Sequence, residues 1–568
     1  MRGREAGLGR RFCGDLGGSD VAIVFREIER KYDAAGAPAA LAAVTSMTGA
    51  AGIAAVSQHD LETLDAVYYD TEDLRLIRAG VTLRRRTGGE DAGWHLKLPA
   101  GADTRDEIRL PLAAAGPAVE PTAGMAGKKA ASTAPGAAAR TAGKPAVTAR
   151  GKAAGGVPAE LASLVRARTR GAALAPVVRM RTSRSVLRLL DDAGRTLAEI
   201  AADHVSAEPA DESAAVSWDE IEVELVTGDR DLLEAVDARL RAAGARPAAT
   251  ATKLERALGD RLRAARRPAG DQAGDAAGQG PPLTPRSPAG EVVLGYVRQQ
   301  ALAITRLDPL VRRDEPDAVH QMRVATRRAR SVLQAFGEIV ERERTRPLCD
   351  ELKWLAAVLG QARDAEVLLA RFTGELAAIP ADLVAGPVGT RIAGHFAARL
   401  EHARAAVVRE LDGQRYISLL DDLDALLADP PLTPLAAGKA RTVLAKPVRR
   451  AARRLRRALA GVPAAGDKDA AIHEARKAAK RARYAAEAAM PALGRQASSQ
   501  AATAKKLQGL LGDHHDSVVA RTVLRGIAGD ARAAAEDTFT YGVLHQRQAC
   551  QASEIERMLP QVAAPLRK

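Results

Sequence analysis

The amino-acid sequence predicts an α+β protein in which a strand-rich part comes first and an all-helical part follows. Between residues 21 and 226, apolar and charged residues alternate over several short runs bounded by Gly and Pro, a pattern typical of strands. From Glu291 onward, apolar residues recur with the period of a helix. Residues 263–290 are rich in Pro, Gly, Asp and Gln, which predicts a linker between two domains.

Length and composition restrict the class of protein. A chain of 568 residues is too long for one ordinary core, and 46% hydrophobic residues are enough for packed domains. The three cysteines lie far apart and form no CxxC pair, which disfavours a disulfide scaffold and a structural zinc site. Aromatic residues make up only 3% of the chain, which disfavours stacking on nucleic-acid bases.

The net charge of +14 lies almost entirely in the helical part. Residues 291–568 contain 44 Lys and Arg against 32 Asp and Glu, whereas residues 1–290 contain 40 against 38. Positive charge without aromatic residues favours a phosphate-rich or other polyanionic partner for the helical part. The near balance of the first part indicates that its acidic residues do more than solvate a surface.

Some segments are expected to lie outside the packed domains. Residues 1–20 are basic and lack an apolar core segment, so we expect a disordered N-terminus and no secretory signal. The uncharged run 34–58 consists mostly of small residues, so it does not predict a membrane span. Residues 117–158 are rich in Ala, Gly, Pro and Thr without periodicity, which predicts a flexible insertion. The expected compartment is the cytoplasm.

The elements of the first part can be placed in order along the chain. Period-two runs predict strands at residues 21–32, 81–87, 94–99, 106–112, 177–190, 195–205 and 217–226. The sequence DDAG at 191–194 predicts a turn between two of these strands. Helical periodicity follows at 229–244 and 252–262.

Nearly every predicted strand has one charged face. Alternation places Glu27, Glu29 and Lys31 on the same side of the first strand. The same holds for the later strands, with the pairs Arg84 and Arg86, His95 and Lys97, Arg105 and Glu107, Arg179 and Arg181, and the trio Glu220, Glu222 and Glu224. Strands that close into a barrel with a charged lumen explain this pattern. In such a lumen, cations would hold phosphate oxygens and carboxylates would hold Mg²⁺ or Mn²⁺.

The helical part contains an internal repeat. The first copy reads HQMRVATRRAR (320–330) and LKWLAAVLGQARDAEV (352–367), and the second reads HEARKAAKRARY (473–484) and AKKLQGLLGDHHDSVV (504–519). Basic residues stand 3, 7, 8 and 10 positions after the histidine in both copies, which places them on one helix face. A third basic helix, 446–457, lies between the copies.

The duplicated basic faces favour a polyanion-binding role. Like charges on one helix face repel each other, and few acidic residues neutralise these faces. The two histidines in register, His320 and His473, predict a histidine pair in the site. Asp364 and Asp516 follow at nearly constant distance, and we expect them to orient basic side chains rather than to touch a ligand.

These repeat motifs resemble the CHAD domain (conserved histidine α-helical domain). The resemblance covers roughly residues 290–565 and both copies, although Val324 stands where the second copy has Lys477. It implies a domain at 291–568 made of two pseudo-symmetric four-helix bundles that bind long-chain inorganic polyphosphate. The residues expected to bind it are His320, Arg323, Arg327, Arg328, Arg330, Arg449, Arg450, Arg453, His473, Arg476, Lys477, Lys480, Arg481 and Arg483.

The strand-rich part resembles the CYTH superfamily of triphosphate tunnel metalloenzymes. The family's ExExK signature stands at residues 27–31. Matches in the family's order follow: YYDT (68–71), LRRR (83–86), WHLKLP (94–99), RTSR (181–184), LAEIAADH (197–204), EIEVEL (220–225) and TKLERAL (252–258). The resemblance covers roughly residues 21–262, apart from the insertion 117–158. It implies an eight-stranded antiparallel β-barrel tunnel with flanking helices.

The CYTH resemblance also implies roles for individual residues. Contacts to phosphate are implied for Lys31, Arg84, Arg86, Lys97, Arg181 with Arg179 as a close rival, and Lys253. Metal ligands are implied at Glu27, Glu29, Asp203, Glu222 and Glu224, with Glu199 and Glu220 also expected to point inward. The central catalytic group would be Glu27, Glu29, Lys31 and Lys97.

Together the two resemblances imply a metal-dependent inorganic triphosphatase, using Mg²⁺ or Mn²⁺, with a polyphosphate-binding domain. Three alternatives remain open. The barrel could act on an organic triphosphate, as class IV adenylyl cyclases and thiamine triphosphatases do. The chain could be a non-catalytic polyphosphate-binding protein associated with granules. The basic helices could also bind nucleic acid without sequence preference, although the scarcity of aromatic residues disfavours this.

Overall fold

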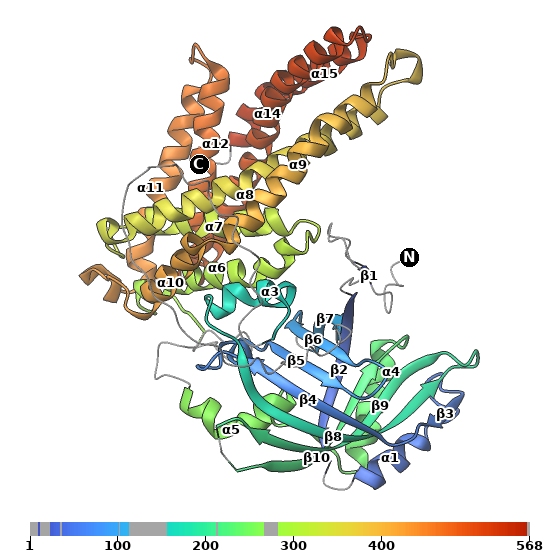
Figure 1. Ribbon diagram of the computed structural model, residues 1–568. Coiled ribbons are helices and arrows are strands. Elements are labelled where there is room, and N and C mark those ends of the chain that lie inside the picture. Colours follow the sequence, from blue (N-terminus) through green and yellow to red (C-terminus); the bar gives the residue numbers. More distant parts are fainter. Residues whose placement is uncertain are drawn as a thin grey trace, which may run out of the picture. The chain divides into compact units, whose positions relative to one another are not determined.

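The computed structural model describes residues 10–11, 23–34, 37–101, 103–112, 156–211, 214–265 and 282–564 (Figure 1). The chain divides into two compact units, one with residues 1–162 and 172–266 and the other with residues 163–171 and 267–568. Among the described residues, no helix has both the length and the apolar character needed to span a bilayer. The expected disordered N-terminus and the insertion 117–158 lie almost entirely outside the described residues.

Eight antiparallel strands of the first unit close into a barrel. Their order around it is β2 (Ile23–Asp33), β10 (Val216–Leu225), β9 (Thr196–Pro209), β8 (Ala175–Leu190), β4 (Glu62–Asp70), β5 (Thr82–Thr87), β6 (Gly93–Pro99) and β7 (Thr104–Pro111). The barrel closes because β7 pairs back onto β2, from Ile23 opposite Arg109 to Ile28 opposite Thr104. This confirms the predicted α+β fold class and the eight-stranded barrel.

The outer face of the barrel is covered by helices, which leaves the charged face of each strand to the lumen. Helices α1 (Ala37–Thr45) and α4 (Arg230–Ala242) cover one side, where Leu233 and Val236 of α4 share a core with Ile221 and Val223 of β10 (Figure 1). The neighbouring lumen positions of β10 are glutamates, because successive side chains alternate across a strand.

A second helical cover places Lys253 beside the lumen. Helix α5 (Lys253–Ala265) packs Leu254 and Leu258 into a core with α2 (Arg75–Arg78), β8 and β9. Buried Asp70 fixes the start of α2, because its carboxylate accepts hydrogen bonds from the backbone N–H groups of Leu76 and Ile77 at 2.8 and 2.9 Å. The aspartate of the YYDT motif is therefore a structural cap.

Several elements of the first unit are absent from the sequence prediction. They include β4, the short strand β3 (Ala55–Gln58), helices α1 and α2, and helix α3 (Ala159–Thr169). The two-residue strands β1 (Arg10–Arg11) and β11 (Arg246–Pro247) pair with β2. β1 falls within the expected disordered segment 1–20, whose other residues are not described.

The end of α3 belongs to the helical unit. Residues 163–171 group with residues 267–568, and Ala167 is part of the largest helical core. Arg170 pairs with Asp421 at 3.3 Å and with Asp424 at 2.7 Å. The domain boundary is therefore not a single point in the sequence near residue 263, as the linker composition predicts.

The second unit is all-helical, as predicted. Its first copy comprises α6 (Ala289–Arg312), α7 (Ala318–Ala335), α8 (Arg342–Ala377), α9 (Val388–Asp412) and α10 (Gln414–Ala428). Its second copy comprises α11 (Ala440–Gly461), α12 (Lys468–Ala488), α13 (Met490–Leu493), α14 (Arg495–Ala533) and α15 (Phe539–Ala563). Short 3-10 turns lie at Ala381–Leu383 and Pro434–Ala437. Helices α8 and α9, and likewise α14 and α15, form long hairpins (Figure 1).

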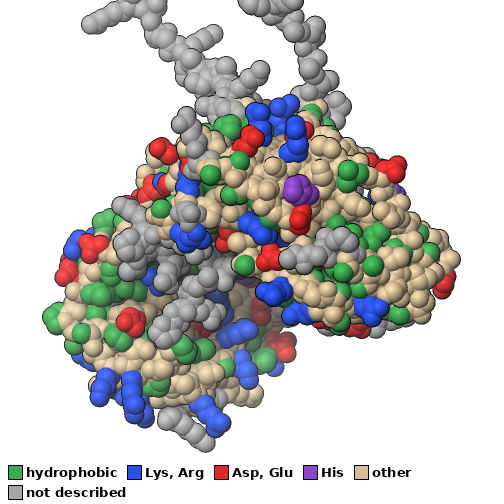
Figure 2. Space-filling view, turned by 90° about the horizontal axis from the view of Figure 1, so that it is seen from below, with side chains coloured by type: hydrophobic (Ala, Val, Ile, Leu, Met, Phe, Trp, Pro, Cys, Tyr) green, Lys and Arg blue, Asp and Glu red, His purple; other side chains and the backbone are tan. Residues whose placement is uncertain are grey.

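The repeat helices α7 and α12 bury their apolar faces and pack against each other. Met322, Ala325 and Ala329 of α7 are buried at helical spacing, and Ala475 and Ala482 of α12 are buried in the same way. The basic residues of both helices therefore lie on the remaining faces. On the molecular face drawn in Figure 2, basic and acidic side chains are largely interspersed.

Candidate functional site

The lumen of the barrel is lined almost entirely by charged side chains from six strands and α5. The lining residues are Glu27, Glu29, Lys31, Tyr68, Thr82, Arg84, Arg86, Asp91, Lys97, Arg105, Glu107, Arg109, Arg184, Glu222, Glu224, Thr252 and Lys253. The structure thus brings together nine residues that the sequence assigns to phosphate or metal: Glu27, Glu29, Lys31, Arg84, Arg86, Lys97, Glu222, Glu224 and Lys253.

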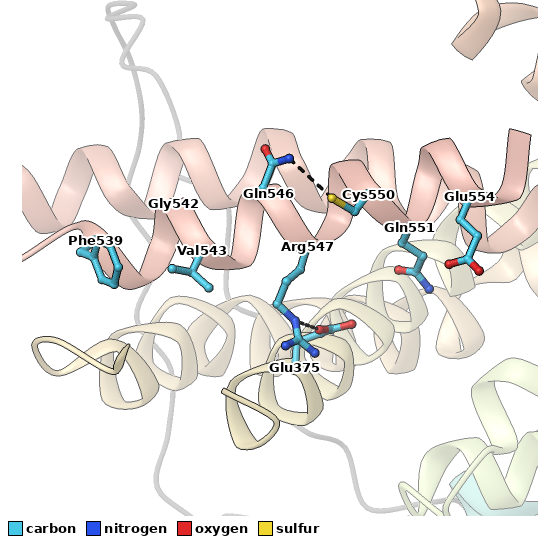
Figure 3. A pocket seen from close by; sticks show the side chains of 9 residues that line it. All are labelled: Glu375, Phe539, Gly542, Val543, Gln546, Arg547, Cys550, Gln551 and Glu554. Carbon is cyan, nitrogen blue, oxygen red and sulfur yellow. Dashed lines mark hydrogen bonds and ion pairs between the residues drawn. The ribbon is translucent and has the colours of Figure 1, made fainter. Parts of the chain in front are cut away.

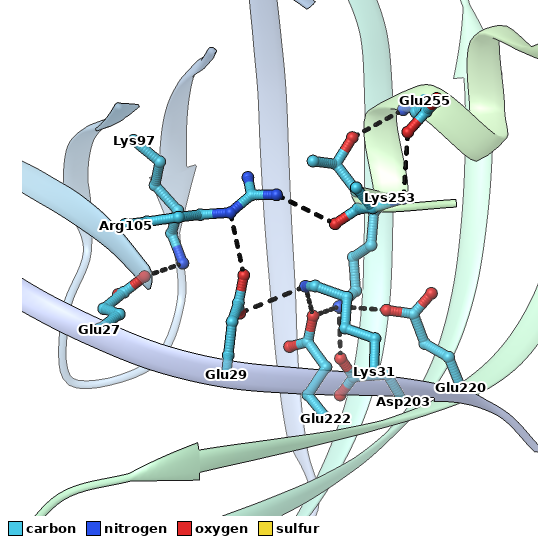
Figure 4. Close-up of polar contacts among 12 residues, drawn as sticks. Glu27, Glu29, Lys31, Lys97, Arg105, Asp203, Glu220, Glu222, Lys253 and Glu255 are labelled. Carbon is cyan, nitrogen blue, oxygen red and sulfur yellow. Dashed lines mark hydrogen bonds and ion pairs between the residues drawn. The ribbon is translucent and has the colours of Figure 1, made fainter. Parts of the chain in front are cut away.

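The Lys253 ammonium lies at the centre of three carboxylates (Figure 4). Its Nζ is 3.0 Å from Asp203 Oδ2, 2.6 Å from Glu220 Oε1 and 2.6 Å from Glu222 Oε1. Arg184 also holds Asp203 through two hydrogen bonds, at 2.8 and 2.7 Å. The carboxylates of this wall are therefore neutralised by side chains of the protein itself.

Glu29 lies between cations from two neighbouring strands (Figure 4). Its carboxylate is 3.4 Å from Lys31 Nζ and 3.4 Å from Arg105 Nε. Burial raises the pKa of Glu29, but Lys31, Lys97 and Arg105 outweigh this and lower it to about 2. Glu29 is therefore ionised at neutral pH and is a ready ligand for a cation.

A second group of carboxylates in the lumen contains Glu27 and Glu107, which share Lys97 and Arg109 as cationic partners. Glu27 pairs with Lys97 at 2.6 Å, and Glu107 lies nearby at 3.8 Å from the same ammonium. Burial, together with the charges of Glu107 and Glu224, raises the pKa of Glu27 to about 8 despite Lys97. Burial is also the largest cause of the raised pKa of Glu224. An additional cation bound here would relieve this repulsion.

The donor set of the lumen fits a hard divalent cation, because it offers only carboxylate oxygens as anionic ligands. Glu27 and Glu224 fit best, since burial first and repulsion from neighbouring carboxylates second raise their pKa values, and a bound cation would offset both. Asp203 fits least well of the expected ligands, because Arg184 and Lys253 already hold both of its oxygens.

His95 supports the lumen from behind Glu107. Its Nε2 lies 2.8 Å from the carbonyl oxygen of Asp91, which can only accept, so Nε2 carries a hydrogen. Its Nδ1 lies 2.9 Å from Glu107 Oε1. Although burial raises it, the pKa of Glu107 is held well below its usual value by Lys97, His95 and Arg109. His95 therefore bridges the Asp91 carbonyl and the Glu107 carboxylate at the back of the lumen.

The structure differs from the predicted set of phosphate-binding residues at Arg179 and Arg181. Both side chains are exposed, and Arg181 forms a surface ion pair with Asp65 at 3.0 Å. Arg184 faces the lumen instead, opposite Asp203 in the β8–β9 register. The RTSR motif places arginines on both faces of one strand, and only the strand pairing shows which of them faces inward.

The sequence prediction also missed three other lumen residues as binding candidates: Arg105, Arg109 and Tyr68. Arg105 shares the charged strand face with Glu107, and this signal was available in the sequence. Tyr68 Oη accepts a hydrogen bond from Arg84 Nη1 at 3.3 Å. Within the described residues, no carboxylate lies at ion-pair distance from Arg84, so its charge is open to an anionic ligand.

A second cluster of cations lies where α7 and α12 meet in the helical unit. We call Arg323, Arg327, Arg476 and Lys480 the basic cluster. Burial, followed by the charges of Arg327, Arg476 and Arg323, lowers the pKa of Lys480 to about 6, and nearby Asp516 does not offset this. Arg327 also donates to Tyr484 Oη at 3.1 Å. The basic cluster combines residues of both repeats, and its four cations exceed the two carboxylates paired with them, Asp364 and Asp516.

The LG and Asp motifs of each repeat hold one arginine of the basic cluster. The guanidinium of Arg323 lies against Gly360, where an added Cβ would come within 3.1 Å of Nη2. Arg323 also pairs with Asp364 at 2.9 Å, and Arg476 lies 3.7 Å from Asp516 in the second copy. These contacts agree with the expectation that the two aspartates orient basic side chains.

Other predicted polyphosphate residues have different surroundings. Arg328 and Arg483 share Glu487, at 3.3 and 2.6 Å, so a carboxylate already offsets their charge. Arg450 pairs with Glu338, and Lys477 pairs with Glu474. Arg449 and Arg453 are exposed on α11, whereas His320, Arg330 and Arg481 are partly buried.

The sequence predicts a pair of His320 and His473, whereas the structure pairs His473 with His515. The ring of His473 packs against the ring of His515, with centroids 4.7 Å apart. His515 comes from the LGDHHD segment on α14 and was not assigned a role from the sequence.

An open pocket on α15 and α8 differs from both sites (Figure 3). It is lined by Glu375, Phe539, Gly542, Val543, Gln546, Arg547, Cys550, Gln551 and Glu554. Its Arg547 is paired with Glu375 at 2.7 Å. This pocket therefore offers no cluster of unpaired cations for a phosphate chain.

Comparisons with known proteins identify two domains in the chain. The CYTH domain model matches residues 26–257, and the CHAD domain model matches residues 295–525. Uncharacterized protein Rv2226 of Mycobacterium tuberculosis is 38% identical over 560 residues, which cover 95% of this chain and 96% of that protein.

Solved structures resemble half of the chain. PptA from Streptomyces chartreusis is 23% identical, and the match covers 49% of this chain and 99% of that chain with a TM-score of 0.43. The CHAD domain from the plant Ricinus communis is 26% identical, and the match covers 50% of this chain and 95% of that chain with a TM-score of 0.43.

Proposed function

The chain belongs to the proteins that carry a CYTH domain followed by a CHAD domain, and from this premise we propose that it is a metal-dependent inorganic triphosphatase whose CHAD domain binds long-chain polyphosphate. CYTH domains form a metal-dependent family of triphosphate-tunnel enzymes. The observation that carries the proposal is the lumen itself, in which cations and carboxylates from several strands and α5 lie within ion-pair distance of each other.

The cations of the lumen would bind the substrate. Arg84 lacks a carboxylate partner among the described residues, so it would bind a phosphate oxygen without first breaking an ion pair. Lys31, Lys97, Arg184 and Lys253 would exchange carboxylate oxygens for phosphate oxygens. Because the lumen excludes much of the solvent, each such contact is stronger than it would be at the surface.

The carboxylates of the lumen would hold the metal. Glu27, Glu29 and Glu224 are the first candidates, with Glu222 and Asp203 as further ligands if Lys253 moves to the substrate. A bound Mg²⁺ or Mn²⁺ would offset charge on the transferred phosphoryl group and lower the pKa of the attacking water. No Cys or His belongs to the described lining, so we expect water to be the nucleophile.

A substrate screen tests the activity. Tripolyphosphate, ATP, thiamine triphosphate and long-chain polyphosphate are each supplied with Mg²⁺ or Mn²⁺, and orthophosphate, pyrophosphate and cyclic nucleotide are measured. We expect orthophosphate release to be fastest from tripolyphosphate. Faster turnover of ATP or thiamine triphosphate would favour the organic-substrate alternative. No turnover of any compound would favour a non-catalytic binding protein.

The variant Glu29→Gln tests the metal assignment. Removing the charge of this ionised carboxylate should lower the hydrolysis rate at least ~100-fold and weaken Mn²⁺ binding. Glu234→Gln is the matched control, because Glu234 is exposed on α4 and pairs with Arg30 outside the lumen. Activity that survives Glu29→Gln would contradict the assignment.

The binding role of the helical part is tested by competition. We expect polyphosphate to bind the full chain more tightly than duplex DNA does at the same ionic strength. The arginines and lysine of the basic cluster can pair with phosphate groups, but the cluster itself contains no aromatic side chain on which bases could stack. Tighter DNA binding would contradict this proposal. Association with polyphosphate granules in the cytoplasm would follow from the binding.

A further inference from the structure

The imidazole rings of His473 on α12 and His515 on α14 face each other beside the basic cluster. Their Nδ1 atoms lie 3.3 Å apart, and the ring planes are inclined by 41°. An imidazolium ring carries hydrogen on both nitrogens. Two Nδ1 atoms at this distance have room for one hydrogen between them. In this arrangement the two rings therefore carry at most one positive charge.

The electrostatics of the pair agree with this geometry. Burial, then Arg476 and His473, lower the pKa of His515 to about 4. Burial, then Lys477 and Arg476, also lower the pKa of His473. Both rings are therefore neutral at pH 7 in the ligand-free protein.

The pKa of Lys480 is lowered in the same way. Its ammonium shares the junction with Arg323 and Arg327 from α7 and Arg476 from α12, and Asp516 of α14 is the one anion among its main neighbours. The charged groups that face the three titratable residues are Arg323, Arg327, Glu474, Arg476, Lys477 and Asp516. Burial and the neighbouring arginines and lysines together disfavour an added proton on each of the three groups, although Asp364 and Asp513 also lie near Arg476.

We propose that a phosphate chain binds the basic cluster together with protons taken up by Lys480, His473 and His515, and that His515 is a ligand-binding residue. The proposal rests on the polyphosphate-binding function proposed above and adds the α14 side of the site to it. Phosphate oxygens placed between α12 and α14 offset the charges of Arg476 and Lys480. They also separate the two rings, so that each can donate a hydrogen bond to phosphate.

The direction of the pH dependence follows from linkage. A ligand that favours the protonated form raises the pKa of that group, so its affinity falls as the pH rises from the free pKa toward the bound pKa. For Lys480 this window begins near pH 6, and one linked proton weakens binding about tenfold per pH unit above it. For His515 the window begins near pH 4 and ends near the ordinary histidine pKa of about 6.5 when bound.

The experiment is calorimetric titration of the full chain with size-fractionated polyphosphate from pH 5 to 8.5. Each pH uses two buffers of different ionisation enthalpy, so that proton uptake is counted directly, and a titration of polyphosphate alone subtracts its own protons. Wild-type affinity should fall about tenfold per pH unit above pH 6.5. Lys480→Arg should flatten this slope because arginine stays charged. His515→Gln should reduce the slope below pH 6 to the part that His473 contributes.

His402→Gln is the matched control, because His402 is exposed on α9 and is not part of the basic cluster. It should leave affinity and proton uptake unchanged. Circular dichroism and the melting temperature show whether each variant folds, and His473→Gln repeats the test if His515→Gln does not. Tight binding without proton uptake would overturn this inference and leave polyphosphate binding intact. No binding at any pH would overturn the proposed function instead. Wild-type behaviour of His515→Gln would remove His515 from the site.

Discussion

Among single residues, Lys480 shows how a binding site can oppose folding. Its neighbours Arg323, Arg327 and Arg476 lower its pKa to about 6, so the folded protein binds fewer protons there than the unfolded chain does. Between pH 6 and the ordinary lysine pKa of about 10.5, this difference destabilises the fold, and the penalty grows as the pH falls. The site therefore keeps a cation for its ligand at a cost to stability.

Replacing Lys480 should separate stability from binding. In phosphate-free buffer at pH 7, Lys480→Met should raise the melting temperature of the helical unit by roughly 2–4 °C, the shift expected for about 1 kcal/mol in a domain of this size. The same variant should bind polyphosphate more weakly. Lys506→Met on the exposed face of α14 is the control and should change neither quantity. A lower melting temperature for Lys480→Met would contradict the inference that Lys480 destabilises the folded protein.

Arg184 and Arg181 give a second residue-scale prediction. Arg184→Met should lower kcat/KM for tripolyphosphate by about 100-fold, because Arg184 faces the lumen and holds Asp203. Arg181→Met should stay within about twofold of wild type, because its side chain is on the outer surface. Steady-state kinetics of the two variants decide the matter, and the reverse order of effects would restore the original assignment.

These arginines also show where prediction from sequence ends. The signature glutamates and Lys31 could be assigned from alternation and resemblance, because one strand face carries all three. RTSR carries arginines on both faces of β8, and the choice between them depends on pairing with β9, which the local sequence does not encode. The same limit applies to His515, which meets His473 only after α12 and α14 have packed together.

At the scale of secondary-structure elements, helices α8 and α14 each carry a glycine that faces an arginine of the basic cluster. An added Cβ at Gly360 would come within 3.1 Å of the Arg323 guanidinium, whereas one at Gly512 would stay 3.9 Å from that of Arg476, an ordinary contact. A glycine in a helix interior costs about 0.5–1 kcal/mol relative to alanine. Close contact with Arg323 explains the glycine at position 360 of α8.

Two glycines of α8 make a matched pair for testing this explanation. Gly360→Ala should displace Arg323 and weaken polyphosphate binding by about three- to tenfold, the loss expected when one charged hydrogen bond is disturbed. Gly374→Ala has open space around its new Cβ and should raise the melting temperature slightly without changing affinity. Affinity and melting temperature are measured for both, and equal affinities would contradict the explanation.

The elements themselves were predicted unevenly. Strands β2, β5 to β10 and helices α4 and α5 follow from clear periodicity. β4 reads ETLDAVYYD, in which small and aromatic residues blur the alternation. Helix α3 has a weak pattern because its end packs on the helical unit through Ala167 rather than on a barrel face. The local sequence carries no information about such tertiary partners, so these elements cannot be predicted from it.

At the scale of the whole molecule, the two proposed sites differ in their exposure to ions of the solvent. The lumen is enclosed and most of its charges are paired, whereas the basic cluster is partly exposed and has few counter-charges. Salt at 0.15 M screens charges beyond about 8 Å, and it screens enclosed charges less.

One chain should therefore show two salt dependences. Raising NaCl from 50 to 200 mM should weaken polyphosphate binding by about tenfold or more, as ion release predicts for a contact with several phosphates. The KM for tripolyphosphate should change less than about threefold over the same range. Both are measured on the full chain at one pH, and equal sensitivity would argue against an enclosed substrate.

Lys253 also affects whether the barrel needs a metal ion in order to fold. Its ammonium lies within 3.0 Å of carboxylate oxygens of Asp203, Glu220 and Glu222, so the barrel carries a tethered counter-ion for its own acidic wall. The folded barrel therefore needs no divalent ion beside these three carboxylates, and we expect the chain to fold without one. The supply of metal would then control the activity of protein that is already folded, and restoring the metal would restore that activity without new synthesis.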